Sequence, residues 1–386
     1  MTQNSYLESK PRYEVLDGLR GVAAMMVVAF HLFETYSGGH INQIINHGYL
    51  AVDFFFVLSG FVIGYAYDDR WNRMSLGTFA KRRLIRLHPM LFIGSIIGGL
   101  LYYFGSCDAF PIISQTPWYT VLLVTLLGCF LIPTRGCLDI RGWAESYSLN
   151  GPAWTLMFEY IANLLYATVI RRLGKIALGV CVFFFAILTV LLTMNIDLFG
   201  FFAERQSLAY TVIGGWSIDP AQLYVGFSRL LYPFFAGLLL SRIGFVIKMK
   251  NGFVNSAIII AALLAMPFVG NEDIQWTNGI YEAVCIIALF PVIVAIGAGS
   301  REMGKRTESV CRFLGEISFP LYITHYPLIY MQMAWADSNA DAPASMHAFV
   351  SISLFIVAVA MAYACLKLYD LPVRAWLKRK LFATGK

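Results

Sequence analysis

The feature that most constrains this sequence is a succession of apolar segments, each about 20 residues long, the length that an α-helix needs to cross a bilayer. The chain is 58% hydrophobic and only 13% charged, whereas soluble domains contain about 25% charged residues. We therefore predict an all-α, polytopic integral membrane helical bundle of about ten transmembrane helices, organised as a single domain over 1–386 with no fused soluble domain. The predicted spans are 13–35, 48–67, 84–105, 152–170, 175–193, 221–241, 253–270, 276–299, 313–335 and 345–368.

The 29 Lys and Arg residues are distributed unevenly between the two sides of these spans. When both termini are placed in the cytoplasm, most of them fall in the inner loops and at the termini, as the positive-inside rule requires. The net charge of +6 therefore reflects topology, and it predicts no nucleic-acid partner. A further apolar run, 117–133, would invert every later loop if it crossed the membrane. We predict that it is a re-entrant or partial segment, or that it lies on the outer side.

The first span carries two ionisable side chains, Arg20 and His31. Eleven residues make three helical turns plus about 20°, so both side chains would project from one face, about 16 Å apart along the axis. Ionisable groups inside a membrane are costly and usually face a cavity, a partner or a reaction site. The alternative is a snorkelling Arg20 near the inner face and a packed His31.

Asp53 lies in the second span, at about the depth of His31 if the two spans are antiparallel neighbours. A carboxylate beside an imidazole fixes its tautomer and stabilises its protonated form, as a general base requires. The sequence thus predicts that Asp53 orients His31; the alternative is a purely structural contact. Arg229, in a later span, is expected to pair with one of the buried acids.

A basic segment enters the third span from the inner side and contains Arg82, Arg83 and Arg86. Arg83 and Arg86 are three residues apart and share a helical face. Guanidinium groups suit phosphates, so we predict that these arginines hold a phosphate-bearing cofactor. The alternative is ordinary inner-side charge or contact with lipid headgroups.

Polar residues also interrupt two later apolar spans. Glu159 follows Trp154 and lies two helical turns into its span, where a lone carboxylate needs a partner. Tyr322 and His325 share a helical face near mid-membrane, one turn beyond Ser318. A packed core histidine is the alternative for His325. The seven cysteines show no metal-ligand spacing, so no metal site is predicted.

Five short motifs follow one another along the chain: Arg20-x10-His31, Gly48-x4-Asp53-Phe-Phe-Phe-Val-Leu-Ser-Gly-Phe61, Arg82-Arg83-x2-Arg86, Trp154-Thr-Leu-x2-Glu159 and Gly315-x2-Ser318-x3-Tyr322-x2-His325. In this order they resemble the integral-membrane acyltransferase-3 family, whose members O-acylate cell-surface glycans and related molecules. The resemblance extends from Tyr13 to about Arg374.

The resemblance implies an O-acetyltransferase of the bacterial cytoplasmic (inner) membrane. It would move an acetyl or other acyl group from cytoplasmic acetyl-CoA to a hydroxyl of a cell-envelope glycan, such as O-antigen or exopolysaccharide. The implied partners are the lipid bilayer and a glycan or lipid-linked glycan acceptor. His31 matches the family's essential histidine, Arg20 its paired basic residue, and Arg83 and Arg86 the arginines associated with the donor.

On this basis His31, oriented by Asp53, is expected to be the general base, and Arg20 to stabilise the donor or the developing oxyanion. The phosphates of acetyl-CoA are expected at Arg82, Arg83 and Arg86. The residues expected to hold the acceptor or support the site are Trp154, Glu159, Ser318, Tyr322 and His325.

The chain departs from the family pattern at Asp370, where the family usually has Glu, and at Phe319, where many members have Tyr. A covalent acyl-histidine and an acyl-serine on Ser59 or Ser318 stay as mechanistic alternatives. The functional alternative is a proton-coupled membrane transporter or flippase that uses the same ionisable residues as a relay. The absence from the sequence of broken helices in two matching halves argues against it.

Overall fold

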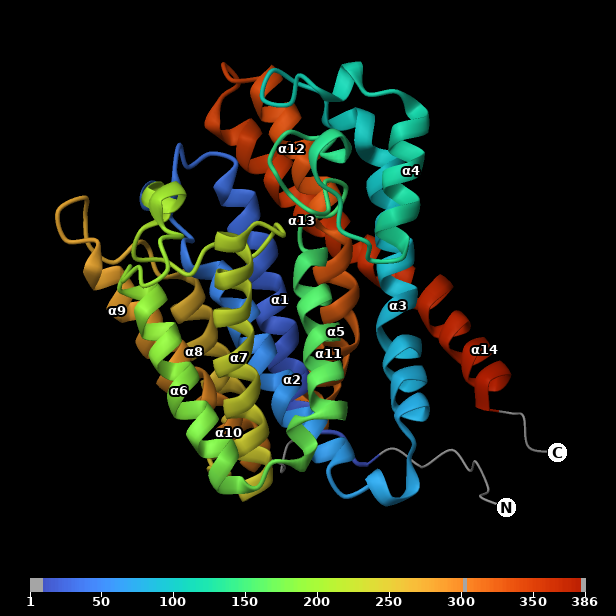
Figure 1. Cartoon of the computed structure of the whole chain (residues 1–386). Helices are drawn as coiled ribbons and strands as arrows, with labels where there is room; N and C mark the ends of the chain where they lie inside the picture. The colour runs from blue at the N-terminus through green and yellow to red at the C-terminus, as the bar shows by residue number, and fades with distance from the viewer. Residues whose placement is uncertain (1–9, 301–303, 383–386) are drawn as a thin grey trace.

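The chain folds into a bundle of helices, and the computed structural model, which describes residues 10–300 and 304–382, contains no β-strand in those residues (Figure 1). Within them, eight helical segments are long and apolar enough to cross a membrane. This confirms the prediction of an all-α polytopic membrane protein. In chain order the α-helices are α1 (Glu14–Glu34), α2 (Ala51–Tyr67), α3 (Leu76–Leu101), α4 (Trp118–Cys129), α5 (Ala153–Thr168), α6 (Lys175–Thr193), α7 (Pro220–Ile243), α8 (Gly252–Ala265), α9 (Trp276–Val284), α10 (Phe290–Gly299), α11 (Lys305–Thr324), α12 (Tyr326–Ser338), α13 (Ala344–Ala364) and α14 (Leu371–Phe382).

Two of the apolar segments form short helices. The predicted span 253–270 overlaps α8, of 14 residues, and the run 117–133 contains α4, of 12 residues. At 1.5 Å per residue α4 is about 18 Å long, too short to cross a hydrocarbon core about 30 Å thick. It lies beside the upper half of α3 (Figure 1), which agrees with the predicted partial segment.

The predicted span 313–335 is interrupted at His325, where α11 ends and α12 begins. Pro327 explains the interruption, because it has no backbone N–H to donate to the carbonyl of Ile323. That carbonyl instead accepts a hydrogen bond from Asn150 Nδ2 at 2.8 Å. The carbonyl that loses its helical donor at the break is therefore hydrogen-bonded by a side chain from the segment that leads into α5.

The long helices run alternately up and down the bundle, and α1 begins and α14 ends in the lower half of Figure 1. Helix α1 therefore begins, and α14 ends, on the same side of the bundle; that this side is the cytoplasmic one stays a prediction. We call the side on which α1 begins the inner side and the opposite one the outer side.

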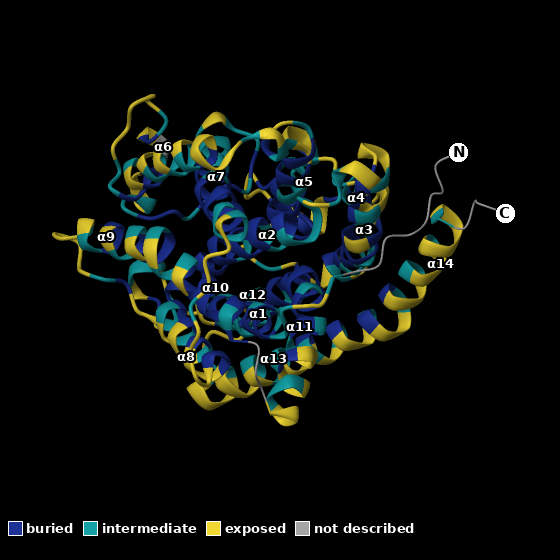
Figure 2. Cartoon of the chain, turned by 90° about the horizontal axis from the view of Figure 1, so that it is seen from below, coloured by how far each residue is buried: buried dark blue, intermediate teal, exposed yellow. Residues whose placement is uncertain are grey.

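Helix α1 lies in the middle of the bundle, in contact with α2, α8, α10 and α11 (Figure 2). Small residues let α11 approach it closely. A Cβ added at Gly21 would overlap the Leu314 carbonyl, and a Cβ at Gly315 would meet the Asp17 side chain. Membrane helices associate through such small residues because there is little hydrophobic gain between helices in lipid. The close approach brings Arg20 of α1 directly against α11.

Helices α2 and α7 cross in the same way. A Cβ at Gly60 would overlap the Phe234 carbonyl, and one at Gly237 would overlap the Val57 carbonyl. At the periphery, α6 exposes large apolar side chains such as Ile176 and Phe183, as expected of a lipid-facing surface, and Figure 2 shows exposed residues along this helix.

Replacing Gly237 by Val should destabilise the protein, because the added methyl groups collide with the backbone of α2. Overpacking of this kind costs about 1–3 kcal/mol. Thermal unfolding in detergent should show a lower Tm for Gly237→Val. Gly179→Val in α6 is the matched control, because a Cβ there has no neighbour within 4 Å. An unchanged Tm for Gly237→Val would contradict the α2–α7 crossing.

Candidate active site

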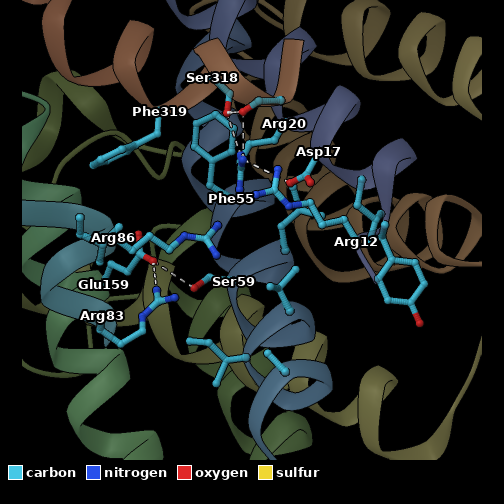
Figure 3. Close-up of a pocket in the computed structure, with 18 of the residues that line it drawn as sticks. Arg12, Asp17, Arg20, Phe55, Ser59, Arg83, Arg86, Glu159, Ser318 and Phe319 are labelled. Atoms are coloured by element: carbon cyan, nitrogen blue, oxygen red, sulfur yellow. Dashed lines mark hydrogen bonds and ion pairs between the residues drawn. The ribbon is translucent and has the colours of Figure 1, made fainter. Parts of the chain in front are cut away.

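A cavity of ≈ 460 Å³ opens on the inner side of the bundle, between α1, α2, α3, α5, α11 and α14. Its wall is rich in guanidinium groups, which come from segments far apart in the sequence (Figure 3). A concave site with this many cations is suited to a polyanionic ligand. The arginines that line it are Arg12, Arg20, Arg70, Arg82, Arg83, Arg86, Arg312 and Arg374.

Arg20 is fixed by α11 and by its own helix. Its Nε donates to Ser318 Oγ at 2.8 Å, and its second terminal nitrogen donates to the Gly315 carbonyl at 3.1 Å. Asp17, one turn earlier in α1, lies 3.2 Å from the same guanidinium. Arg20 is thus held inside the cavity rather than extended to the membrane surface, so the snorkelling alternative is not what the structure shows.

Arg83 and Glu159 form an ion pair at 2.6 Å on the opposite wall. The Ser59 hydroxyl lies 3.5 Å from the same carboxylate oxygen. Figure 3 shows the Arg86 guanidinium in the space between this pair and Arg20. Within the described residues Arg86 has neither a hydrogen bond nor an ion pair, and its side chain is exposed to the cavity. It is the guanidinium best placed to receive an incoming anion.

The far end of the cavity is closed by aromatic side chains. Phe55 and Tyr322 meet edge to face, with ring centroids 5.5 Å apart. Thr155 Oγ1 lies 3.0 Å from the Tyr322 hydroxyl. The cavity wall therefore combines guanidinium groups with an aromatic region that carries two hydroxyl groups.

His31 lies beyond this closed end, in the outer half of α1. Its Nδ1 is 2.7 Å from Glu34 Oε2. Its ring stacks on His325 at 5.5 Å and meets the edge of Tyr326 at 4.7 Å. The structure thus joins two predicted site residues, His31 and His325, at the break between α11 and α12.

His325 connects the two regions. Its ring is 6.1 Å from that of Tyr322, and its Nδ1 lies 3.0 Å from the Tyr322 carbonyl. The side chain is fully buried, and Nε2 has no hydrogen-bond partner among the described residues. A column of aromatic and imidazole rings therefore runs from the closed end of the cavity to His31.

The predicted contact between Asp53 and His31 is wrong. Asp53 is fully buried and forms an ion pair with Arg229 of α7 at 2.7 Å. The same guanidinium also donates to the carbonyl of Tyr49 at 2.6 Å. A buried cation needs a carboxylate partner, and Asp53 supplies it, which confirms the expectation that Arg229 pairs with a buried acid. Asp53 therefore fixes α2 to α7.

The cavity brings together most of the predicted site residues and leaves four outside its wall. Those in the wall are Arg20, Arg82, Arg83, Arg86, Glu159, Ser318 and Tyr322; those outside it are His31, Asp53, Trp154 and His325. Trp154 packs over Arg229, with the guanidinium carbon 5.4 Å from the ring centroid, and so belongs to the Asp53 region. Its predicted contact with the acceptor has no support in this placement.

Sequence reasoning missed Glu34, although its spacing of three residues from His31 places both on one helical face. It also missed a cluster in the segment between α4 and α5. There Glu145 accepts a hydrogen bond from the Tyr330 hydroxyl at 2.7 Å, and the Arg141 guanidinium lies 3.4 Å from the Tyr330 ring centroid. Nothing in the apolar pattern signals this contact, because it joins a loop to α12.

Comparison with known proteins gives an independent result. A family model described as an acyltransferase domain, Acyl_transf_3, matches residues 13–366. The match covers all the motifs singled out above.

Among curated proteins, the chain is 32% identical to protein 2 in the picA locus of Rhizobium radiobacter over 165 residues, which are 40% of this chain and 81% of that protein. It is 23% identical to O-acetyltransferase OatA of Staphylococcus aureus (strain NCTC 8325 / PS 47) over 389 residues, 94% of this chain and 58% of the relative. The chain thus spans little more than half of the length of OatA. No solved structure matches it significantly.

Glu145 makes a pH dependence of stability testable. Burial raises the pKa of Glu145 to about 7, although the hydrogen bond from Tyr330 and the charge of Arg141 act in the opposite direction. An exposed glutamate has a pKa of about 4.3, so the folded protein keeps this proton where the unfolded chain has lost it. The resulting stabilisation is complete below about pH 4.3 and is lost as the pH rises through about 7.

The free energy of unfolding of the wild type should therefore fall by about 3 kcal/mol or less between pH 5 and pH 8, relative to that of Glu145→Gln. The difference in Tm between the two proteins should change over the same window. The variant keeps a neutral hydrogen-bonding group in place of the acid and removes this titration. A difference that is constant over the same window would contradict a buried, protonated Glu145.

Proposed function

The chain belongs to the acyltransferase-3 family, and from this premise we propose that it is a multi-pass membrane O-acetyltransferase of the bacterial cytoplasmic membrane. It takes an acetyl group from acetyl-CoA on the inner side and transfers it to a hydroxyl of a cell-envelope glycan, such as O-antigen or exopolysaccharide. The observation that carries the proposal is the arginine-lined cavity, whose closed end is joined to His31 by the rings of Tyr322 and His325. The name of OatA as an O-acetyltransferase supports the acetyl donor and the hydroxyl acceptor.

The cavity mouth supplies the binding chemistry for the donor. Acetyl-CoA carries several phosphate groups, and guanidinium forks bind phosphates through paired, charge-assisted hydrogen bonds. Arg86 has no competing partner among the described residues, and Arg12 and Arg20 lie on the facing wall (Figure 3). Arg83 is already paired with Glu159, so we assign this pair to fixing the wall between α3 and α5. The acetyl end then points toward Phe55 and Tyr322.

The reacting groups meet between the closed end and His31. The acceptor hydroxyl attacks the acetyl carbonyl while its proton moves to His31; the new C–O bond forms, the C–S bond breaks, and the CoA thiolate takes up a proton. Because Phe55 and Tyr322 close the cavity, their side chains have to move for the acetyl group to reach this layer. General base catalysis of this kind contributes about 10²–10⁴-fold.

Arg20 lies at the inner end of the same helix, and Asp17, Ser318 and the Gly315 carbonyl hold it in place. We propose that Arg20 binds the polar groups of the donor and does not act at the reacting atoms, because it lies about 16 Å from His31 along α1. Ser318 positions Arg20 through its hydroxyl. The chemistry needs no metal, and the bilayer and a glycan acceptor are the partners.

The transporter alternative requires acids that are free to bind and release protons across the bundle. Asp53 and Glu159, the two acids in that predicted relay, are each paired with an arginine at 2.7 and 2.6 Å. Incubation of purified protein with labelled acetyl-CoA separates the two functions, because only an acyltransferase hydrolyses the thioester or transfers the label.

His31→Ala should abolish acetyl transfer, since it removes the proposed base. The measurement is transfer of label from acetyl-CoA to glycan in membranes, with membrane insertion and Tm checked in parallel. Wild-type transfer by a correctly inserted His31→Ala protein would overturn the assignment of the base.

Arg86→Gln should raise the KM for acetyl-CoA by at least about tenfold with a smaller effect on kcat, because one charge-assisted contact is worth about 1.5–3 kcal/mol. Arg172→Gln is the matched control: this arginine is also exposed on the inner side but does not line the cavity. Equal KM values for the two variants would show that the donor does not bind in the cavity.

A further inference from the structure

We propose that Glu34 is the residue that positions His31 for proton transfer. The inference rests on the proposed function, in which His31 is the general base, and it assigns the supporting carboxylate to a residue that neither the motifs nor the sequence analysis identified. The evidence is the 2.7 Å contact between His31 Nδ1 and Glu34 Oε2.

This contact fixes which ring nitrogen can act as a base. A carboxylate only accepts hydrogen bonds, so Nδ1 must carry the proton that it donates to Glu34. The lone pair then lies on Nε2. Among the described residues the hydrogen bond of the His31 side chain is the one made by Nδ1, which leaves Nε2 for an acceptor hydroxyl.

The remaining neighbours of His31 hold its plane but supply no charge. His325 stacks on one face at 5.5 Å, Tyr326 meets the ring edge-on at 4.7 Å, and Phe30 packs at 4.8 Å. When Nε2 accepts the hydroxyl proton, the ring becomes a cation. Glu34 is the carboxylate in contact with it, so Glu34 stabilises the charge that develops in the transition state.

Asp53 cannot position His31 without a large free-energy cost. Both of its oxygens accept hydrogen bonds from Arg229, and the pair is almost completely buried. Turning Asp53 toward α1 would leave a guanidinium uncompensated in the bundle interior, and a broken buried pair is strongly destabilising. Glu34 is not paired with an arginine, because His31 is its one ion-pair partner among the described residues.

Glu34 also has a suitable location. It is in the last turn of α1, on the outer side, and 39% of its side chain is exposed. It can therefore be replaced without opening a hole in the core. The donor cavity lies at the other end of α1, and Glu34 is not part of its wall.

The test is a series of substitutions at Glu34, measured by transfer of label from acetyl-CoA to glycan. Glu34→Ala should lower kcat about 10²-fold, and Glu34→Gln should lower it less, because an amide oxygen still accepts from Nδ1 but lacks the charge. Glu34→Asp should restore part of the activity. The KM for acetyl-CoA should stay within about twofold of the wild-type value in every variant, since the donor cavity is untouched.

Added formate should restore part of the activity of Glu34→Ala, because a small carboxylate can enter the space left at the exposed end of α1, and it should not restore His31→Ala. Asp337→Asn is the matched control: it also neutralises an exposed carboxylate on the outer side, but the acid contacts the backbone of Asp108 and not His31. Its kcat should be that of the wild type.

Wild-type kcat in Glu34→Ala, or a rise in KM without a fall in kcat, would overturn the proposal. The outcome is distinguishable from failure of the proposed function. If His31→Ala is inactive and Glu34→Ala is fully active, the base assignment holds and only the role of Glu34 is wrong. If His31→Ala is fully active, the base assignment itself fails.

Discussion

The free-energy cost of burying guanidinium groups inside an apolar bundle determines which helices of this protein are in contact. A cation in a low-dielectric interior needs a carboxylate, a carbonyl or water, and three arginines of the bundle find such a partner on another helix. Arg229 joins α7 to α2 through Asp53, and Arg83 joins α3 to α5 through Glu159. Arg20 joins α1 to α11 through Ser318 and the Gly315 carbonyl. These contacts set the helix positions that leave the cavity between them.

The same contacts separate arginines that support the fold from those that can bind a ligand. Arg229 is fully occupied, and its replacement would leave Asp53 unpaired. Arg86 is exposed to the cavity with no partner in the described part of the chain. A binding site for phosphates needs exposed guanidinium groups such as that of Arg86. The paired arginines hold in place the helices that carry them.

Helix α1 carries both the arginine proposed to bind the donor and the histidine proposed to act as the base. Arg20 faces the cavity, and His31 lies about 16 Å farther along the axis, in the layer formed by the break at His325. That break depends on Pro327, which frees the Ile323 carbonyl for Asn150. Helical periodicity fixes both the face and the spacing of residues on one helix, so the positions of Arg20 and His31 along α1 follow from the sequence; their roles stay predictions.

Periodicity could not predict which helices face each other. Asp53 and His31 were expected to touch because their depths are similar, but depth says nothing of the rotation of α2 about its axis, and Asp53 faces α7. The loop contact between Glu145 and Tyr330 is equally invisible to a pattern search. Glu34, by contrast, could have been found from its spacing to His31 alone. The cavity residues from α1, α3, α5 and α11 were recovered because each marks an ionisable or polar position in an apolar span.

The most direct test of the account is a structure of the protein in lipid nanodiscs with a non-hydrolysable acetyl-CoA analogue. The account predicts density for the phosphates beside Arg86 in the inner cavity, with the acyl end at Phe55 and Tyr322 and directed toward His31. An analogue bound elsewhere, or with its acyl end turned away from the column of Tyr322, His325 and His31, would contradict it.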